Sequence, residues 1–163
     1  MGRINWLYKG KEITSTAQYP NWANHFVYLI TDENGRKYVG KKQITSVRNV
    51  KTTKSNYNRL KKLGYPVKRT KDKKKSTKKN IVWNYKKTVK GDNGSLNYTG
   101  SCVPLNKKIK NGLGYKKEIL YFCKTKKQAT YYELKEQFCR GVIENDLYWN
   151  ENILNKFFKR DLM

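Results

Sequence analysis

The chain contains few of the residues on which metal and disulfide chemistry depends. Its 163 residues include one histidine, His25, and three cysteines that lie far apart, Cys102, Cys123 and Cys139. This set cannot form a His-rich metal site, the close cysteine pairs of a zinc site, or a fully paired disulfide framework. We expect the cysteines to be reduced thiols and His25 to be an ordinary residue at the entry to a strand.

Long apolar runs and acidic residues are also scarce. No stretch approaches the roughly 20 apolar residues that cross a bilayer, and the first residues lack the apolar segment of a signal peptide. We therefore expect no membrane segment and a cytoplasmic location. Only 12 Asp and Glu stand against 37 Lys and Arg, which gives a formal net charge of +25. This excess predicts a polyanionic partner, with nucleic acid as the leading candidate.

The length predicts one domain, 1–163. We divide it into an N-terminal arm (1–25), a core (26–153) and a tail (154–163). Of the 37 basic residues, 19 lie between Lys41 and Lys90, where Asp72 is the one acid. This pattern predicts a basic insertion at about 43–80, weakly helical up to Lys62, followed at 68–79 by a loop that either follows DNA phosphates or is simply solvated. The predicted nucleic-acid contacts are Lys41, Lys42, Arg59, Lys68, Arg69, Lys73, Lys74, Lys75, Lys78 and Lys79.

A β-hairpin is predicted from Phe26 to Gly40. Its first strand is rich in β-branched, aromatic and aliphatic residues, and Asn34-Gly35 supplies the positive φ angles that a hairpin turn needs. If the loop holds an odd number of residues, such as three, Tyr28 and Tyr38 lie on the same face of the two strands.

The rest of the chain predicts an α+β fold: a small antiparallel three-stranded sheet, made of the hairpin and a third strand, flanked by helices. Residues 101–112 read as a short helix with Pro104 in its first turn, and 115–123 as a well-covered strand. A longer helix is expected from an N-cap at Thr125 to about residue 145, with a last short helix around 153–158. The expected buried stripe of the longer helix is Tyr131, Leu134, Phe138 and Val142.

The motifs on these elements, in this order, resemble those of the GIY-YIG nuclease domain. Residues 26–28 (Phe-Val-Tyr) stand where the family has Gly-Ile-Tyr, and 38–40 (Tyr-Val-Gly) where it has Tyr-Ile-Gly. Arg48 follows at the spacing of the family's catalytic arginine, Glu133 lies where its metal-binding glutamate is expected, and Asn150 matches its asparagine.

A narrower similarity is to phage-type members of the family. Tyr38-Val39-Gly40-Lys41-Lys42 is similar to their Tyr-Ile-Gly-Lys-Lys, and residues 98–101 match their Tyr-x-Gly-Ser. Glu133 and Gln137 match their Glu-x-x-x-Gln. Thr52 occupies a position where many members have a histidine or tyrosine, for which Tyr57 is a substitute to consider.

The resemblance implies a DNA endonuclease in a bacterial or phage-infected cell that leaves a 5′-phosphate and a 3′-hydroxyl. Glu133 would hold one Mg²⁺ or Mn²⁺, and no small-molecule cofactor is expected. Arg48 would hold the scissile phosphate bidentately. Two copies could meet on DNA to cut both strands.

The remaining candidate catalytic residues concern the attacking water. Tyr28 and Tyr38 would orient or deprotonate it, and Lys41 or Lys42 would favour the phenolate form electrostatically. Asn150 would orient the site backbone or a metal-bound water.

Each assignment has a plainer alternative. Glu133 could be a surface glutamate paired with Lys126, Lys127 or Arg140, the tyrosines could be core residues, and Asn150 could cap a helix. For the whole chain, the alternatives are a non-catalytic basic module that binds DNA or RNA and a ribosome-associated structural protein.

Overall fold

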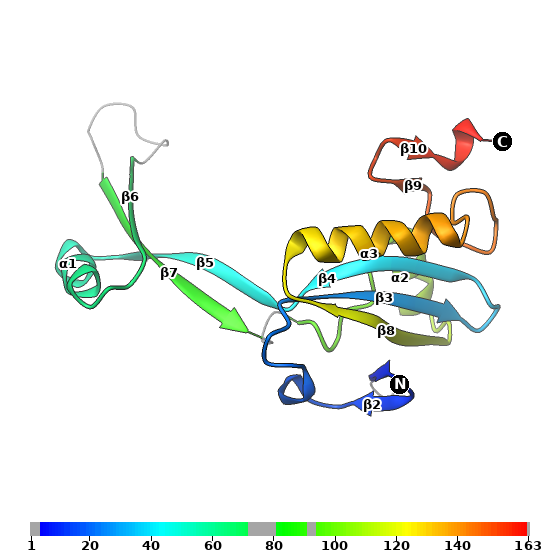
Figure 1. Cartoon of the computed structure of the whole chain (residues 1–163), viewed down its shortest axis with the longest axis horizontal. Helices are drawn as coiled ribbons and strands as arrows, with labels where there is room; N and C mark the ends of the chain where they lie inside the picture. Colours follow the sequence, from blue (N-terminus) through cyan, green and yellow to red (C-terminus); the bar gives the residue numbers. More distant parts are fainter. Residues whose placement is uncertain (1–3, 72–80, 91–93, 163) are drawn as a thin grey trace. The chain divides into compact units, whose positions relative to one another are not determined.

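The computed structural model describes residues 4–71, 81–90 and 94–162, which belong to two units, each packed mainly within itself (Figure 1). The first unit is formed by Met1–Ile44 together with Gly91–Met163, and the second by Thr45–Lys90. The predicted basic insertion falls mostly within the second unit, and the single domain stays a prediction. In the described part of the chain, no helix has the length and apolar character needed to span a membrane.

The fold is α+β, as predicted, but the main sheet is larger than expected. It has five strands in the order β2-β1-β8-β3-β4, of which the predicted hairpin and third strand are the last three. The extra two strands come from the N-terminal arm, where β1 pairs in parallel with β8 across more than a hundred residues of sequence. The strands are β1 (Trp6–Tyr8), β2 (Lys11–Ile13), β3 (His25–Asp32), β4 (Lys37–Gln43) and β8 (Tyr115–Cys123).

The hairpin of β3 and β4 turns where predicted, but of Asn34 and Gly35 only the glycine has a positive φ angle. Asp32 N–H donates to the Arg36 carbonyl at 2.8 Å, which leaves residues 33–35 at the tip, with Gly35 at φ 81°. The Asp32 carboxylate also accepts from the backbone N–H groups of Asn34 and Arg36. The register pairs Tyr28 with Gly40, and the two tyrosine rings lie on one face with their centroids 6.2 Å apart.

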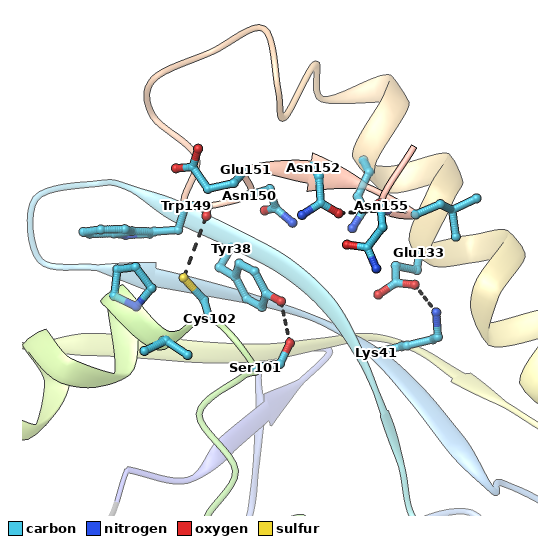
Figure 2. Close-up of a pocket in the computed structure, with 14 residues that line it drawn as sticks. Tyr38, Lys41, Ser101, Cys102, Glu133, Trp149, Asn150, Glu151, Asn152 and Asn155 are labelled. Atoms are coloured by element: carbon cyan, nitrogen blue, oxygen red, sulfur yellow. Dashed lines mark hydrogen bonds and ion pairs between the residues drawn. The ribbon is translucent and has the colours of Figure 1, made fainter. Parts of the chain in front are cut away.

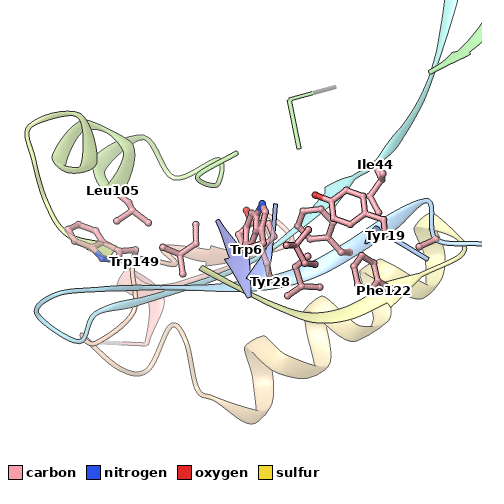
Figure 3. Packing of buried hydrophobic residues seen from close by; sticks show 12 residues of the cluster. Trp6, Tyr19, Tyr28, Ile44, Leu105, Phe122 and Trp149 are labelled. Carbon is pink, nitrogen blue, oxygen red and sulfur yellow. The ribbon is translucent and has the colours of Figure 1, made fainter. Parts of the chain in front are cut away.

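The two faces of the sheet are covered by different elements. One face carries an aromatic core in which Trp6, Phe26 and Tyr28 contact one another, with Leu105 of α2 (Val103–Lys110) packed on the same cluster (Figure 3). The other face packs against α3 (Lys126–Cys139), which contributes the buried Ala129. Side chains alternate between these faces, so the odd residues of β4 face α3 and the even ones face the aromatic core.

Helix α3 begins as predicted but ends early. The Thr125 hydroxyl accepts from the backbone N–H of Gln128, and the side-chain oxygen of Gln128 accepts from the backbone N–H of Lys124. The helix stops at Cys139 because Gly141, at φ 55°, forms a left-handed cap. The predicted stripe was wrong in half of its members. Tyr131 and Phe138 are mostly exposed, whereas Leu134 packs against the core and Val142 is buried just beyond the end of the helix. The helix itself buries Ala129 and Gln137.

After α3 the chain forms a small hairpin where a helix was predicted. Strands β9 (Asn152–Ile153) and β10 (Phe157–Phe158) pair antiparallel, and a 3₁₀ helix, η2 (Lys159–Asp161), follows. A second 3₁₀ helix, η1 (Thr16–Gln18), lies in the N-terminal arm. The three cysteines are free thiols, and His25 is the first residue of β3.

The second unit is a three-stranded antiparallel sheet, ordered β5-β7-β6, with one helix. The weak helix expected between Gln43 and Lys62 is partly wrong, because its first half is a strand. The loop expected at 68–79 begins as a strand, and residues 72–80 lie outside the described part. The elements are β5 (Thr45–Thr52), α1 (Lys54–Lys62), β6 (Val67–Lys71) and β7 (Ile81–Lys90).

Candidate functional site

A cleft of about 550 Å³ lies within the first unit, along the outer strand β4 (Figure 2). Four segments meet there: β4, the start of α2, the middle of α3 and the stretch that follows α3. The lining residues are Tyr38, Lys41, Ser101, Cys102, Val103, Pro104, Glu133, Gln137, Trp149, Asn150, Glu151, Asn152, Leu154 and Asn155. Predicted site residues from three distant parts of the sequence are therefore brought together.

Glu133 of α3 is the acidic residue held most firmly at this cleft. Its side chain is 14% exposed, and its Oε2 atom forms an ion pair and hydrogen bond with Nζ of Lys41 on β4. Its ion-pair partner is thus none of Lys126, Lys127 and Arg140. Arg140 pairs with Glu136 instead. The surface ion pairs weighed as the plain alternative for Glu133 are thus not the ones formed.

Tyr38 faces the same cleft through its hydroxyl. Its Oη atom lies 2.8 Å from Oγ of Ser101. Burial raises the pKa of Tyr38 to about 12, although the bond with Ser101 acts in the opposite direction. The phenol is therefore protonated near neutral pH and can donate or accept a hydrogen bond. It is not a ready base.

Tyr28 is completely buried beneath this hydroxyl pair and does not line the cleft. Its Oη atom forms no hydrogen bond of normal geometry among the described residues, although the phenol of Tyr98 is close enough to interact with it. Burial raises the pKa of Tyr28 well above its usual range, and the phenols of Tyr38 and Tyr98 add to the shift. A Cβ atom on Gly40, the residue opposite, would lie 2.4 Å from this oxygen, so the glycine makes room for the ring.

The two lysines after Gly40 lie on opposite faces of the sheet. Lys41 pairs with Glu133 on the α3 side of the sheet. Lys42, on the other side, lies 4.2 Å from the ring centroid of Tyr98, and burial lowers the pKa of Lys42. The pKa values of both motif tyrosines are raised, mainly by burial, and activation of a phenolate by these lysines stays a prediction.

Residues 98–101, singled out as a motif, pack over the two motif tyrosines, and Ser101 lines the cleft. The ring of Tyr98 meets that of Tyr28 edge-on, with centroids 5.8 Å apart. Gly100, at φ 93°, turns the chain so closely over Tyr38 that a Cβ atom would lie 3.2 Å from the ring. This turn brings Ser101 onto the Tyr38 hydroxyl.

Asn150 secures the backbone of β4. Its amide oxygen accepts from Val39 N–H at 3.0 Å, and its amide nitrogen donates to the Val39 carbonyl at 2.9 Å. Gln137 also donates to that carbonyl, at 3.5 Å. Asn150 is therefore bonded to the backbone of β4 and does not cap a helix, while its predicted role in the site stays a prediction.

Trp149 fixes the segment that carries Asn150. Its backbone N–H donates to the Lys37 carbonyl at 2.7 Å, and its indole N–H donates to the Asp32 carboxylate at 3.0 Å. The guanidinium of Arg36 lies 3.7 Å from the indole centroid. The hairpin turn and the cleft are thus tied together.

The other predicted site residues belong to the second unit. Arg48 lies on β5, but its side chain is outside what the structure describes. Arg59 is on α1, and Lys68 and Arg69 are exposed on β6. Tyr57, considered as a substitute for a proton-transfer residue, packs against Trp83 with ring centroids 4.7 Å apart. Lys73, Lys74, Lys75, Lys78 and Lys79 lie outside the described residues.

Several lining residues were not predicted. Ser101 was part of a quoted motif but had no assigned role, and only its contact with Tyr38 shows one. Glu151, exposed at the rim, is a second carboxylate on the cleft. Asn152 and Asn155 add amides, and the side-chain oxygen of Asn152 accepts a hydrogen bond from the backbone N–H of Asn155. The abundance of asparagines after residue 149 was a signal that could have found them.

The residues present fit a hard divalent cation. No cluster of three or more His, Cys, Asp or Glu side chains occurs among the described residues, so a cage made only of protein ligands is not available. Mg²⁺ commonly binds one or two carboxylates and keeps waters or substrate phosphates as its other ligands. Glu133 supplies such a carboxylate inside a cleft that is open to substrate.

Comparison with protein families matches residues 6–153 to the family described as "Putative endonuclease segE, GIY-YIG domain". The match covers most of the chain and includes every cleft residue except Leu154 and Asn155. No curated protein and no solved structure matches the chain.

Proposed function

The chain belongs to the GIY-YIG endonuclease domain family, and on that premise we propose that it hydrolyses phosphodiester bonds of DNA with one divalent cation held at Glu133. The observation that carries the proposal is the meeting, in one cleft, of the Glu133 carboxylate, the Lys41 ammonium and the Tyr38–Ser101 hydroxyl pair. These groups supply a hard anionic ligand, a positive charge for phosphate and hydrogen bonds for water.

Glu133 and Lys41 are the charged groups that substrate would meet first. Glu133 would hold Mg²⁺ or Mn²⁺ through its carboxylate. When bound, that cation would offset charge on the phosphate and lower the pKa of a water. In the structure, the ammonium group of Lys41 is bonded to one oxygen of the Glu133 carboxylate. A phosphate oxygen offers this ammonium a second anionic partner in the same cleft.

Tyr38 is proposed to position the attacking water. Because its pKa is about 12, the phenol keeps its proton and holds the water by hydrogen bonding. The Ser101 hydroxyl orients the phenol from the other side. Tyr28 acts as a positioning residue from below, and Asn150 keeps the Val39 peptide, and with it Tyr38, in place.

Arg48 is proposed to hold the scissile phosphate, because a bidentate guanidinium suits a pair of phosphate oxygens. Displacement of the 3′-oxygen by water leaves a 5′-phosphate and a 3′-hydroxyl. A single site of this kind cuts one strand at a time, so a double-strand break would require two copies of the chain on DNA.

Cleavage of supercoiled plasmid in Mg²⁺ tests this proposal. We expect Glu133→Gln and Arg48→Ala each to slow nicking by about 10²-fold or more, because each removes a group that meets charge in the transition state. Glu144→Gln is the matched control, since Glu144 is exposed and does not line the cleft.

Two results would count against the proposal. Nicking at the wild-type rate by Glu133→Gln would remove this carboxylate from the site. Absence of cleavage with any divalent cation, together with tight DNA binding, would favour the non-catalytic binding module.

A further inference from the structure

The second unit carries far more positive charge than its size explains. Residues 45–90 hold 17 of the 37 basic residues and one acid, a net charge of +16, whereas the remaining 117 residues carry +9. That acid, Asp72, lies outside the described residues, so no acidic side chain occurs in the part of this unit that the structure describes. A surface with this excess of positive charge attracts the phosphates of a nucleic acid whatever its base sequence.

The unit is built as an insertion. Thr45, where its chain enters, is paired with Lys90, where its chain leaves. Because entry and exit lie side by side, the unit can be added to the first one without altering the order of its strands. The geometry is that of an accessory module, distinct from the cleft.

Helix α1 presents a polar face on this module. Tyr57, on the inner side, packs against Trp83 of β7. Lys54, Asn58 and Lys61 are all exposed, as is Lys62, and their spacing of four, three and one residues puts them along the outer side of the helix. The outer face therefore has an amide at its centre and ammonium groups around it.

One cation beside this face is already oriented. Nε and Nη2 of Arg59 donate to the side-chain oxygen of Asn56, at 3.2 and 3.0 Å. The Asn56 amide in turn donates to the Thr52 hydroxyl at 2.7 Å, which anchors it to the end of β5. A guanidinium held in this way loses less freedom when it meets a phosphate.

We propose that α1 docks in the major groove of duplex DNA, with Asn58 toward the base edges and Lys54, Lys61 and Lys62 on the flanking phosphates. An α-helix with its side chains is about 10–12 Å across, which matches the width of the major groove, about 12 Å, and an asparagine amide can bond an adenine bidentately. The inference rests on the proposed function in taking DNA as the ligand, and it assigns target selection to this helix.

Duplex DNA is favoured over single strands by the state of the aromatic residues. Single-strand binding proteins stack bases on exposed rings. Here Tyr57, Trp83 and Tyr85 are half-buried, and the guanidinium of Arg69 lies 5.5 Å from the Trp83 ring centroid. Tyr65 is the one exposed aromatic in the described part of this unit.

Equilibrium binding of the full chain to a fluorescent duplex, measured in EDTA over a series of salt concentrations, tests the docking. All proteins carry Glu133→Gln, so no result depends on cleavage. Replacing Lys54, Lys61 and Lys62 by Gln should weaken binding at least about tenfold and reduce the slope of log affinity against log salt by about 2 to 3. The matched control replaces Lys11, Lys127 and Lys135, which are exposed in the first unit, and should keep the wild-type slope.

Selection of bound sequences from a randomised duplex pool tests the base contact. Asn58→Ala should keep the salt slope but lose about tenfold discrimination at one or two positions. An unchanged slope in the α1 triple variant, unchanged selection by Asn58→Ala, or tighter binding to single-stranded DNA or RNA than to duplex would overturn the proposal. Because cleavage is not measured, a failed nuclease assay leaves these outcomes interpretable.

Discussion

Replacing Gly40 by alanine is the sharpest test of how the hairpin builds the site. The new Cβ atom would lie 2.4 Å from Oη and 2.7 Å from Cζ of Tyr28, and 3.1 Å from Cε1 of Tyr38. Carbon atoms pack at about 3.5–4.0 Å. The Tyr28 ring cannot move away easily, because it is fully buried and meets the rings of Trp6 and Phe26 at centroid distances of 5.3 and 6.0 Å.

The expected cost follows from this overpacking. Forcing a methyl group into a well-packed core costs about 1–3 kcal/mol. The φ angle of Gly40 is not in the left-handed region, so the backbone adds no strain. We expect Gly40→Ala to lower the free energy of unfolding by about 2 kcal/mol and the Tm by about 4–8 °C. Displacement of Tyr38 should also slow cleavage by up to about 10²-fold, well below the Tm.

Urea unfolding and plasmid nicking measure the two effects. Gly35→Ala is the control: its φ of 81° strains an alanine, but a Cβ atom there meets nothing within 4 Å, so stability should fall while nicking stays normal. Adding Tyr28→Phe to Gly40→Ala removes the closest atom but leaves the ring, and should restore only part of the loss. Wild-type stability and nicking in Gly40→Ala would refute the argument that this ring needs a glycine opposite it.

The remaining predictions concern the polar groups of the site. Tyr28→Phe should leave the free energy of unfolding unchanged or raise it by up to about 1 kcal/mol, because the hydroxyl that it removes is buried without a hydrogen bond of normal geometry. A clear decrease in this free energy, measured by urea unfolding, would contradict the prediction. Because the pKa of Tyr38 is raised to about 12 in the folded protein, the phenol ionises in the unfolded chain at a lower pH than in the folded one. The un-ionised phenol therefore contributes about 3 kcal/mol to the free energy of unfolding below pH 10, and this contribution is lost between pH 10 and 12. Comparing the unfolding of wild type and Tyr38→Phe across that window checks it. Asn150→Ala should lower the free energy of unfolding by about 3 kcal/mol, because it leaves the N–H and carbonyl groups of the buried Val39 backbone short of hydrogen-bond partners. An unchanged Tm in calorimetry would show that these two hydrogen bonds do not stabilise the fold.

Local signals in the sequence predicted the elements that carry the site. Asn34-Gly35 identified the hairpin turn, and the continuous apolar run of 115–123 identified β8, the central strand of the sheet. The N-cap Thr125 gave the start of α3 and placed Glu133 correctly on it. Each of these features depends on residues only a few positions away, so a short stretch of sequence is enough to predict it.

Some errors overlooked a signal that was present. Gly141 ends α3 through two bonds, from Gly141 N–H to the Phe138 carbonyl and from Val142 N–H to the Gln137 carbonyl, the arrangement for which glycine is favoured. In β5, the β-branched residues at 45, 47, 50 and 52 favour a strand, whereas the prediction of a weak helix followed the basic and polar residues between them.

Other features depend on contacts that no local pattern contains. Strand β1 is three residues long, and its partner β8 lies more than a hundred residues away in sequence, so only the assembled sheet makes it a strand. The raised pKa of Tyr38 likewise follows from burial beneath the segment at 98–101. The sequence placed these tyrosines on one face but could not show that the lysines beside them point elsewhere.

The position of β4 at the edge of the sheet explains how one strand serves both sides of the cleft. In a central strand, side chains on opposite faces are separated by the neighbouring strands. Here Tyr38 reaches the cleft from one face and Lys41 from the other, while the outward-pointing Val39 peptide meets Asn150. A slip of one residue would exchange the two faces and turn the Val39 peptide toward β3. The three-residue tip at 33–35 sets this register, so the length of the turn, and not the side chains at its tip, decides which faces Tyr38 and Lys41 occupy.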